Sequence, residues 1–140
     1  MSRGKWTIFG SGFGLYGYLP AILRDENQDI YLPNKYRTIV ENRPDLNYFY
    51  EKIKWYENLE EVIDFIDSIV IACNPERQPT LVRNLLKGER IKRFILEKPL
   101  AIDPWEADKF LKILIKKNIN FTCSYSFLYT NWFKDLELKI

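Results

Sequence analysis

Four closely spaced glycines near the start of the chain constrain its fold more than any other feature. Gly10, Gly12, Gly14 and Gly17 follow the apolar run Trp6–Phe9, which is typical of a short buried strand. A strand that ends in glycines and turns into a helix lets the backbone approach a phosphate, and the free amide groups of the helix start face that anion. Glycine clusters also form ordinary tight turns, so the stretch is either a dinucleotide-binding loop or a simple turn.

Short strand patterns and helix patterns alternate along the rest of the chain. The most apolar run, Ser68–Cys73, is rich in β-branched residues, as is typical of a central parallel strand covered on both faces. Alternation with short connections predicts an α/β fold with a doubly wound, mostly parallel sheet. The other expected strands are 6–9, Ile30–Leu32, Ile53–Trp55, Lys92–Glu97 and Ile119–Tyr125, and the expected helices are Tyr16–Arg24, Asn34–Asn42, Leu59–Phe65, Pro79–Lys87 and one that begins at Pro104.

Two of the expected helices carry start signals. Asn58 is placed to cap Leu59–Phe65. Asp103 is placed to cap the helix that begins at Pro104, and Glu106 to complete a capping box. The apolar face of that last helix is expected to consist of Ala107, Phe110, Leu111, Leu114 and Ile115.

Composition excludes several classes of function. The 140 residues fit one domain, and a net charge of +2 is too small to indicate nucleic-acid binding. No run reaches the ~18 apolar residues of a membrane span, and no secretory signal precedes the first strand. Cys73 and Cys123 are expected to be reduced thiols of a cytoplasmic protein. The basic, aromatic stretch Tyr48–Tyr56 is better explained by packing than by polymer binding.

The chain contains no histidine. This excludes Ser-His-Asp and Cys-His catalysis as well as histidine metal sites, and we expect no metal. Acid–base chemistry must therefore use lysine, tyrosine, aspartate or glutamate.

Ligands of open parallel sheets bind beyond the carboxyl ends of the strands. The second strand usually ends near an acid that binds the ribose 2′-hydroxyl, but here Asn34, Lys35 and Arg37 stand instead. Cations at this place favour the 2′-phosphate of NADP over NAD, and the alternative is a solvated basic turn. After the central strand, Asn74 is either a ribose or nicotinamide contact or a simple cap of the next helix.

The triplet Glu97-Lys98-Pro99 ends the fifth expected strand. A lysine at this edge can hydrogen-bond a substrate hydroxyl and the cofactor ribose, and it can take part in proton transfer. The alternative is an exposed ion pair between Glu97 and Lys98.

Three segments, IFGSGFGLYGYLPAI, SIVIACNPERQPTLV and FILEKPLAID, resemble successive motifs of the glucose–fructose oxidoreductase / inositol 2-dehydrogenase (Gfo/Idh/MocA) family. The resemblance extends from about Lys5 to Tyr125. It implies a Rossmann domain that binds NAD or NADP, and a sugar, sugar nucleotide or similar polyol that is oxidised or reduced at a carbinol carbon. It also implies a second α/β domain that supplies the rest of the substrate site.

The resemblance assigns roles to single residues. Lys98 matches the catalytic lysine of the family, and Glu97 matches the neighbour that helps to position lysine and cofactor. The Lys98–Pro99 bond is a candidate cis peptide. Cys73, Asn74 and Pro75 fall on the nicotinamide side. Gln78, which is also expected at the cofactor, occupies a position where histidine is common.

The same alignment fixes the register of the glycine loop. The only literal G-x-G-x-x-G is Gly12–Gly17, but the expected strand ends at Phe9. Counted from the strand end, Gly10 makes the tight turn, Gly12 admits the pyrophosphate, and Leu15 stands at the third glycine position. The loop residues expected at the cofactor are Gly10, Ser11, Gly12, Phe13, Gly14 and Leu15, with Gly14 relieving the crowding that Leu15 would cause.

The expected domain organisation is a dinucleotide-binding domain at residues 1–125, with residues 126–140 as the start of a C-terminal α/β domain that is absent or truncated. An unfinished element leaves an apolar patch, so we expect a homo-oligomer. The alternative function is a non-catalytic nucleotide-binding or interaction module derived from the same family.

Overall fold

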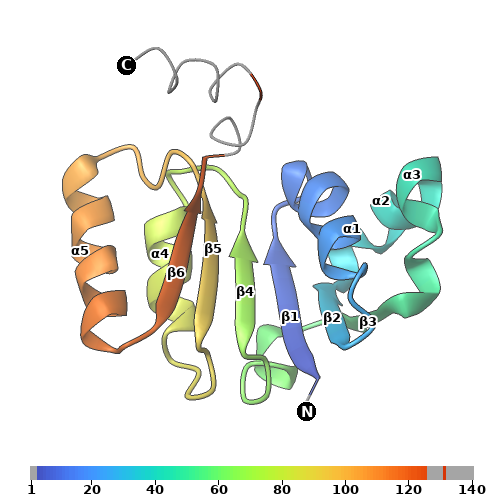
Figure 1. Ribbon diagram of the computed structural model, residues 1–140, viewed down its shortest axis with the longest axis horizontal. Coiled ribbons are helices and arrows are strands. Elements are labelled where there is room, and N and C mark those ends of the chain that lie inside the picture. Colours follow the sequence, from blue (N-terminus) through green and yellow to red (C-terminus); the bar gives the residue numbers. More distant parts are fainter. Residues whose placement is uncertain (1–2, 126–130, 132–140) are drawn as a thin grey trace.

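The computed structural model describes residues 3–125 and residue 131. Within them the chain forms a six-stranded parallel sheet in the order β3-β2-β1-β4-β5-β6 (Figure 1). The predicted α/β class with a doubly wound parallel sheet is therefore confirmed. The strands are β1 Gly4–Phe9, β2 Gln28–Pro33, β3 Ile53–Tyr56, β4 Ser68–Ile71, β5 Arg93–Glu97 and β6 Asn120–Ser124.

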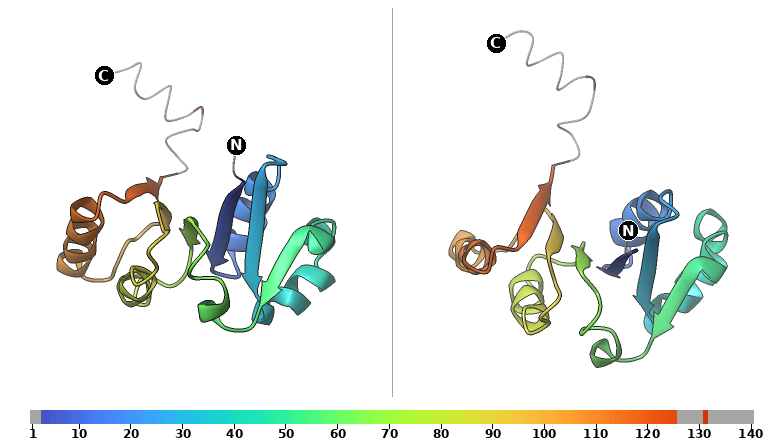
Figure 2. Two further views of the ribbon diagram at one scale, coloured as in Figure 1. Left: turned by 90° about the horizontal axis from the view of Figure 1, so that it is seen from below. Right: turned by 60° about the horizontal axis from the view of Figure 1, so that its bottom comes forward.

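Helices cover the two faces of the sheet separately, with α1, α2 and α3 on one face and α4 and α5 on the other (Figure 2). They are connected to the strands by short turns, as the alternating pattern predicts. The α-helices are α1 Leu19–Ile22, α2 Arg37–Asn42, α3 Pro44–Asn47, α4 Gln78–Leu85 and α5 Pro104–Lys116. A π-helical turn spans Gly14–Tyr18, and 3₁₀ turns span Asn34–Tyr36, Tyr50–Lys52 and Leu59–Glu61.

The sheet separates two hydrophobic cores. Ile8 of β1 and Val70 of β4 belong to the core under α1, whereas Ile69 and Ile71 of β4 belong to the core under α4 and α5. Successive side chains of a strand point to opposite faces, so a strand between two cores is buried at every position. All four residues of β4 are buried for this reason. None of the described helices is long and apolar enough to cross a membrane.

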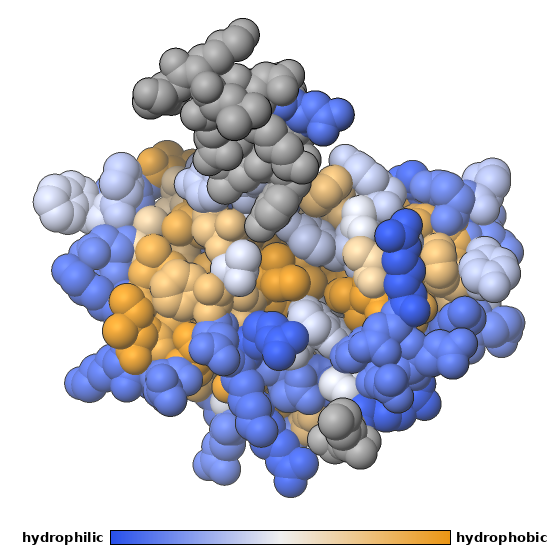
Figure 3. All heavy atoms as spheres, in the orientation of Figure 1, coloured by the Kyte–Doolittle hydropathy of each residue, from blue (hydrophilic) through white to orange (hydrophobic). Residues whose placement is uncertain are grey.

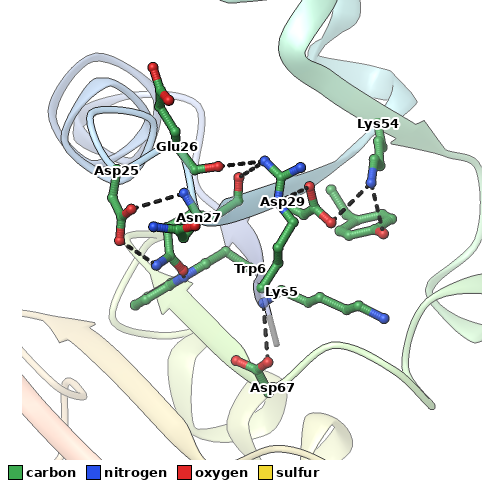
Figure 4. A network of polar contacts seen from close by, with 11 residues as sticks. Lys5, Trp6, Asp25, Glu26, Asn27, Asp29, Lys54 and Asp67 are labelled. Carbon is green, nitrogen blue, oxygen red and sulfur yellow. Dashed lines mark hydrogen bonds and ion pairs between the residues drawn. The ribbon is translucent and has the colours of Figure 1, made fainter. Parts of the chain in front are cut away.

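Charged side chains gather at the N-terminal ends of the strands, along the lower edge of Figure 3. Asp29 pairs there with Arg3 at 3.3 Å and with Lys54 at 3.1 Å, and the Asp67 carboxylate accepts the amide of Lys5 (Figure 4). Asp29 of β2 thus bridges the start of β1 and the β3 residue Lys54, and Asp67 bonds the β1 backbone. These contacts join β1, β2 and β3 at the end of the sheet opposite the glycine loop.

Three expected helices differ from the structure. Tyr16–Arg24 is replaced by the π-helical turn from Gly14 and by α1, which ends at Ile22. Leu59–Phe65 is not a continuous helix, because it mixes bonds to the third and the fourth preceding residue after its 3₁₀ turn. α4 begins one residue before Pro79, at Gln78.

The last helix corrects two further expectations. The Asp103 carboxylate accepts the amide of Trp105 at 2.9 Å, as a cap should. The Glu106 carboxylate does not close a capping box, because it accepts hydrogen bonds from Arg83 and Lys109 instead. Phe110 and Leu114 are buried, but Ile115 at the end of the expected apolar face is 65% exposed. The expected element after Tyr125 lies outside the described residues, apart from residue 131.

Candidate functional site

Gly10 stands where β1 and β4 meet, which is the point at which the strand order reverses. Its φ of +132° is a conformation that side-chain-bearing residues rarely adopt, and a Cβ atom would lie 2.1 Å from the carbonyl oxygen of Ala72. The Gly10 amide donates to the buried hydroxyl of Tyr36 at 2.9 Å. The tight turn at this position therefore requires glycine, as the register from the strand end predicts.

The next two glycines have different surroundings. A Cβ atom on Gly12 would meet no atom within 4 Å, so this part of the loop faces open space. A Cβ atom on Gly14 would lie 3.0 Å from Ile8 Cγ2 and 3.5 Å from the Cβ of Ala72. Gly14 thus allows the close packing of helix on strand that a third glycine usually gives, while Leu15 points into the core and is fully buried.

The π-helical turn explains this shift by one position. The amide of Leu19 reaches back to the carbonyl oxygen of Gly14, five residues earlier, so the turn holds one residue more than an α-helical turn. The extra residue lets Gly14 face the sheet while Leu15 still enters the core.

A pocket of about 640 Å³ opens beyond the ends of β1, β2 and β4. Its charged lining residues are Lys35, Glu76 and Arg77. Burial raises the pKa of the Cys73 thiol, which therefore stays protonated at neutral pH. The complete lining is Phe9, Gly10, Lys35, Tyr36, Cys73, Glu76, Arg77, Thr80, Leu81 and Asn84.

Of the three polar residues expected at the end of β2, the structure brings only Lys35 into this pocket. The side-chain amide of Asn34 donates to the Glu57 carboxylate. Arg37 donates to the Tyr50 hydroxyl and lies over the rings of Tyr50 and Trp55, at 5.5 and 6.0 Å from their centroids. Arg37 is thus occupied on the other side of the loop.

Arg77 is the pocket residue that sequence reasoning missed. It belongs to the turn that connects β4 to α4, and its amide donates to the carbonyl of Asn74 at 2.9 Å. The Asn74 side-chain oxygen accepts the amide of Glu76 at 2.9 Å, so this side chain shapes the turn. The signal that could have identified Arg77 is its place as a cation just after the end of a central strand.

On the other side of the site, Gln78 holds the loop that carries the lysine. Its fully buried amide donates to the carbonyl oxygens of Glu97 and Pro99, both at 2.9 Å. Its own Oε1 is buried and has no hydrogen-bond partner among the described residues. The Lys98–Pro99 bond is cis, as the resemblance implied.

Glu97 is engaged by the glycine-loop helix rather than by its neighbour. Its carboxylate accepts the Tyr18 hydroxyl at 2.5 Å. Burial and the Glu97 carboxylate raise the pKa of Tyr18 well above its ordinary value, so the phenol remains a donor at neutral pH. Lys98 is exposed and forms no ion pair with another described residue, so the alternative interpretation, an ion pair with Glu97, does not apply to this part of the chain.

These residues fit a dinucleotide. Gly10 and Gly12 leave room for close approach of a ligand to the loop backbone, and two cations, Lys35 and Arg77, line the pocket beyond them. β5 ends at Glu97, directly before Lys98, and the carboxyl ends of β1, β4 and β5 lie on the same side of the sheet (Figure 1). The arrangement can thus hold a long anionic ligand along this edge with an ammonium group beside it.

Solved structures share the fold. The putative oxidoreductase yvaA from Bacillus subtilis superposes with a TM-score of 0.79 at 14% identity, over 97% of this chain and 38% of that chain. The super-repressor mutant of Gal80p from Saccharomyces cerevisiae superposes with a TM-score of 0.75 at 18% identity, over 99% of this chain and 38% of that chain. KijD10, a 3-ketoreductase from Actinomadura kijaniata solved in complex with NADP and TDP-benzene, superposes with a TM-score of 0.74 at 11% identity, over 96% of this chain and 41% of that chain.

The chain thus spans less than half the length of these structures. No curated protein matches it in sequence. The family model GFO_IDH_MocA, described as an oxidoreductase family with an NAD-binding Rossmann fold, matches residues 5–125. The chain therefore belongs to the Gfo/Idh/MocA oxidoreductase family, and residues 5–125 are its NAD-binding Rossmann domain.

Proposed function

We propose that this chain provides the cofactor half of an NAD(P)-dependent oxidoreductase acting on a sugar, sugar nucleotide or similar polyol. The observation that carries the proposal is the exposed Lys98 at the end of β5, on the edge that also holds the glycine loop and the pocket. The chemistry that the bound dinucleotide supplies is hydride transfer at a carbinol or carbonyl carbon.

The residues of the chain divide the remaining work. The backbone around Gly10 and Gly12 binds the pyrophosphate, with Ser11, Phe13 and Gly14 completing the loop. The Lys98 ammonium holds the substrate oxygen and exchanges a proton with it. The Glu97 carboxylate accepts the Tyr18 hydroxyl and forms no ion pair with Lys98, which leaves the ammonium group available to substrate.

We favour NADP over NAD, because cations and no acid follow β2. Lys35 supports this choice by lining the pocket. The 3-ketoreductase with a similar fold was itself solved with NADP. The carbohydrate substrate rests on the family resemblance.

We also propose that residues 1–125 are the cofactor domain and that residues 126–140 begin a second α/β domain that completes the substrate site. The free thiols of Cys73 and Cys123 are in keeping with a cytoplasmic location. Ile102 and Trp105, which are 70% and 74% exposed, support self-association, and a monodisperse monomer in light scattering at high concentration would contradict it.

Titration with NADPH and NADH, followed by nicotinamide fluorescence, tests the cofactor site. We expect saturable binding at micromolar concentrations that is lost in Gly12→Val, because a branched side chain fills the open space over the loop. Thr38→Val on the exposed side of α2 is the matched control and should bind like the wild type. A folded wild-type chain without saturable binding of either nucleotide would refute the proposal.

The role of Lys98 is tested in the chain extended by its downstream reading frame. Lys98→Met should abolish turnover of a polyol substrate and leave NADPH binding within about twofold, because the loss falls on proton transfer rather than on the pyrophosphate site. Unchanged turnover in Lys98→Met would show that the lysine is not catalytic.

A second candidate is a non-catalytic nucleotide-binding regulator. It is favoured by the similar fold of Gal80p, whose solved form is a super-repressor mutant, and by the absence of the usual acid after β2. Saturable NADPH binding without turnover of any polyol by the extended chain would select this candidate.

A further inference from the structure

We propose that Arg77, with Lys35 beside it, binds the 2′-phosphate of NADP, so that an arginine from the turn before α4 sets the cofactor preference. The inference rests on the proposed function, since it names the part of the site that distinguishes NADP from NAD. It moves the discrimination away from Arg37, the arginine that follows β2.

Both cations are available in the pocket. Lys35 and Arg77 line it, and neither forms an ion pair with any other residue that the structure describes. The Lys35 ammonium lies 5.2 Å from the centroid of the Tyr36 ring, which lines the same pocket. The positive charge of Arg77 acts to lower the pKa of both Tyr36 and Cys73, and that of Lys35 acts on Cys73, although burial outweighs these effects. The two charged groups therefore act on the same pocket wall.

The backbone that carries Arg77 is held on both sides. Its amide donates to the Asn74 carbonyl at 2.9 Å, and its own carbonyl accepts the amide of Leu81 at 3.0 Å in the first turn of α4. The planar guanidinium can form a bidentate bond to phosphate, which a lysine cannot form, and it loses less freedom per hydrogen bond than an ammonium group does.

Arg37 is held at Tyr50 and Trp55 and does not reach the pocket. Its guanidinium donates to the Tyr50 hydroxyl and lies over the Tyr50 and Trp55 rings, and it is not part of the pocket lining. Arg37→Ala and Arg77→Ala remove the same charge from neighbouring loops, so Arg37→Ala is a matched control for the general electrostatic effect.

Glu76 works against the two cations. It also lines the pocket, and a carboxylate there repels a 2′-phosphate and suits a free ribose hydroxyl. Substitutions at Glu76 and Arg77 are therefore expected to move the preference between NADPH and NADH in opposite directions.

The test measures the dissociation constants of NADPH and NADH for the whole chain by nicotinamide fluorescence, and those of 2′,5′-ADP and 5′-AMP by calorimetry. Arg77→Ala should raise the dissociation constants of NADPH and 2′,5′-ADP by about tenfold or more, and those of NADH and 5′-AMP by about twofold at most. Lys35→Ala should also lower the affinity for NADPH, whereas Glu76→Gln should raise it. Arg77→Lys should bind NADPH more tightly than Arg77→Ala but less tightly than the wild type. Arg37→Ala should change the NADPH to NADH ratio by less than about twofold, because exposed charges outside the pocket are screened.

The outcomes separate the inference from the proposed function. If the wild type binds both nucleotides and Arg77→Ala weakens them equally, Arg77 does not read the 2′-phosphate, but the cofactor site stands. If Arg37→Ala, rather than Arg77→Ala, lowers the NADPH to NADH ratio, the discrimination belongs to the end of β2 and the inference is wrong. If the folded wild type binds neither nucleotide, the proposed function and the inference both fail.

Discussion

Gly10 shows how much one residue can depend on the absence of a side chain. Its φ of +132° is costly for any other residue, and its α-carbon faces the Ala72 carbonyl at the junction of β1 and β4. Gly12, two positions later, has neither constraint. The loop thus contains one glycine that the fold requires and one that the fold tolerates and, in our proposal, the ligand requires.

This difference predicts opposite effects on stability. Gly10→Ala should lower the free energy of unfolding by at least about 2–3 kcal/mol, because strain and a clash with the Ala72 oxygen act together. Gly12→Ala should be neutral or stabilise by up to about 1 kcal/mol, since alanine fits there and restricts the unfolded chain. Urea denaturation of the two variants gives both values, and equal losses would contradict this account of the loop.

The two arginines Arg37 and Arg77 show what sequence reasoning resolves at this scale. Arg77 was missed, whereas Lys35 and Arg37 were predicted near the end of β2 from the chain order alone. The direction of each side chain was not, because Arg37 is diverted by Tyr50 and Trp55, which belong to a segment far from the site in the sequence pattern. The role of Gln78 in holding the Lys98 loop was equally hidden, since it depends on the carbonyl groups of Glu97 and Pro99, which lie 19 and 21 residues further along the chain.

Among the elements, the π-helical turn Gly14–Tyr18 has the greatest effect on the site. It places Gly14 against the sheet and sends Leu15 into the core, where the side chain is fully buried. A motif search would regard Leu15 as a defect of the glycine loop. The structure gives it a packing role instead.

Leu15→Gly, which would restore a literal glycine motif, should therefore be harmful. We expect the free energy of unfolding to fall by at least about 3 kcal/mol, because the substitution leaves a cavity in the core and glycine is less favourable than leucine in a helical turn. The same change at the exposed neighbour, Tyr16→Gly, should cost only about 1 kcal/mol. Thermal or urea unfolding measures both, and tighter NADPH binding by a stable Leu15→Gly chain would restore the motif interpretation.

Strands were easier to predict from this sequence than helices. Runs such as Ile69–Ile71 are β-branched and buried on both faces, so pattern and packing agree. The segment Leu59–Phe65 has a correct start signal, since the Glu61 carboxylate accepts the Asn58 amide at 2.8 Å. So short a segment gains little from its own hydrogen bonds, however, and the burial of Val62 and Ile66 decides its path.

At the scale of the whole molecule, buried phenols couple stability to alkaline pH. Burial raises the pKa of Tyr56 to about 12 and also raises the pKa values of Tyr18 and Tyr36 above their ordinary value of 10.0. The unfolded chain then loses these protons at a lower pH than the folded chain does. Stability is therefore fully present below about pH 10 and falls as the pH rises from there.

Tyr56→Phe isolates one of these protons. Between about pH 10 and 12 the free energy of unfolding of the wild type should fall by about 2–3 kcal/mol more than that of the variant, because each unit of pKa shift corresponds to about 1.36 kcal/mol. At neutral pH the variant should be less stable by about 1 kcal/mol, because Tyr56 shares a hydrogen bond with Thr7. Tyr48→Phe, at a side chain that is 75% exposed, should leave the profile unchanged, and parallel profiles for all three chains would contradict the linkage.

The position of β4 between the two cores has a consequence for motion. Each of its four residues is buried, and β1 and β5 pair with it on both sides, so its amide protons can exchange with solvent only when most of the domain opens. The outer strands β3 and β6 each pair with one neighbour and are free to open locally. β4 is thus the slowest-exchanging part of the domain, and a ligand that binds only the folded domain slows exchange of the β4 amides further, because it raises the free energy of the opening on which they depend.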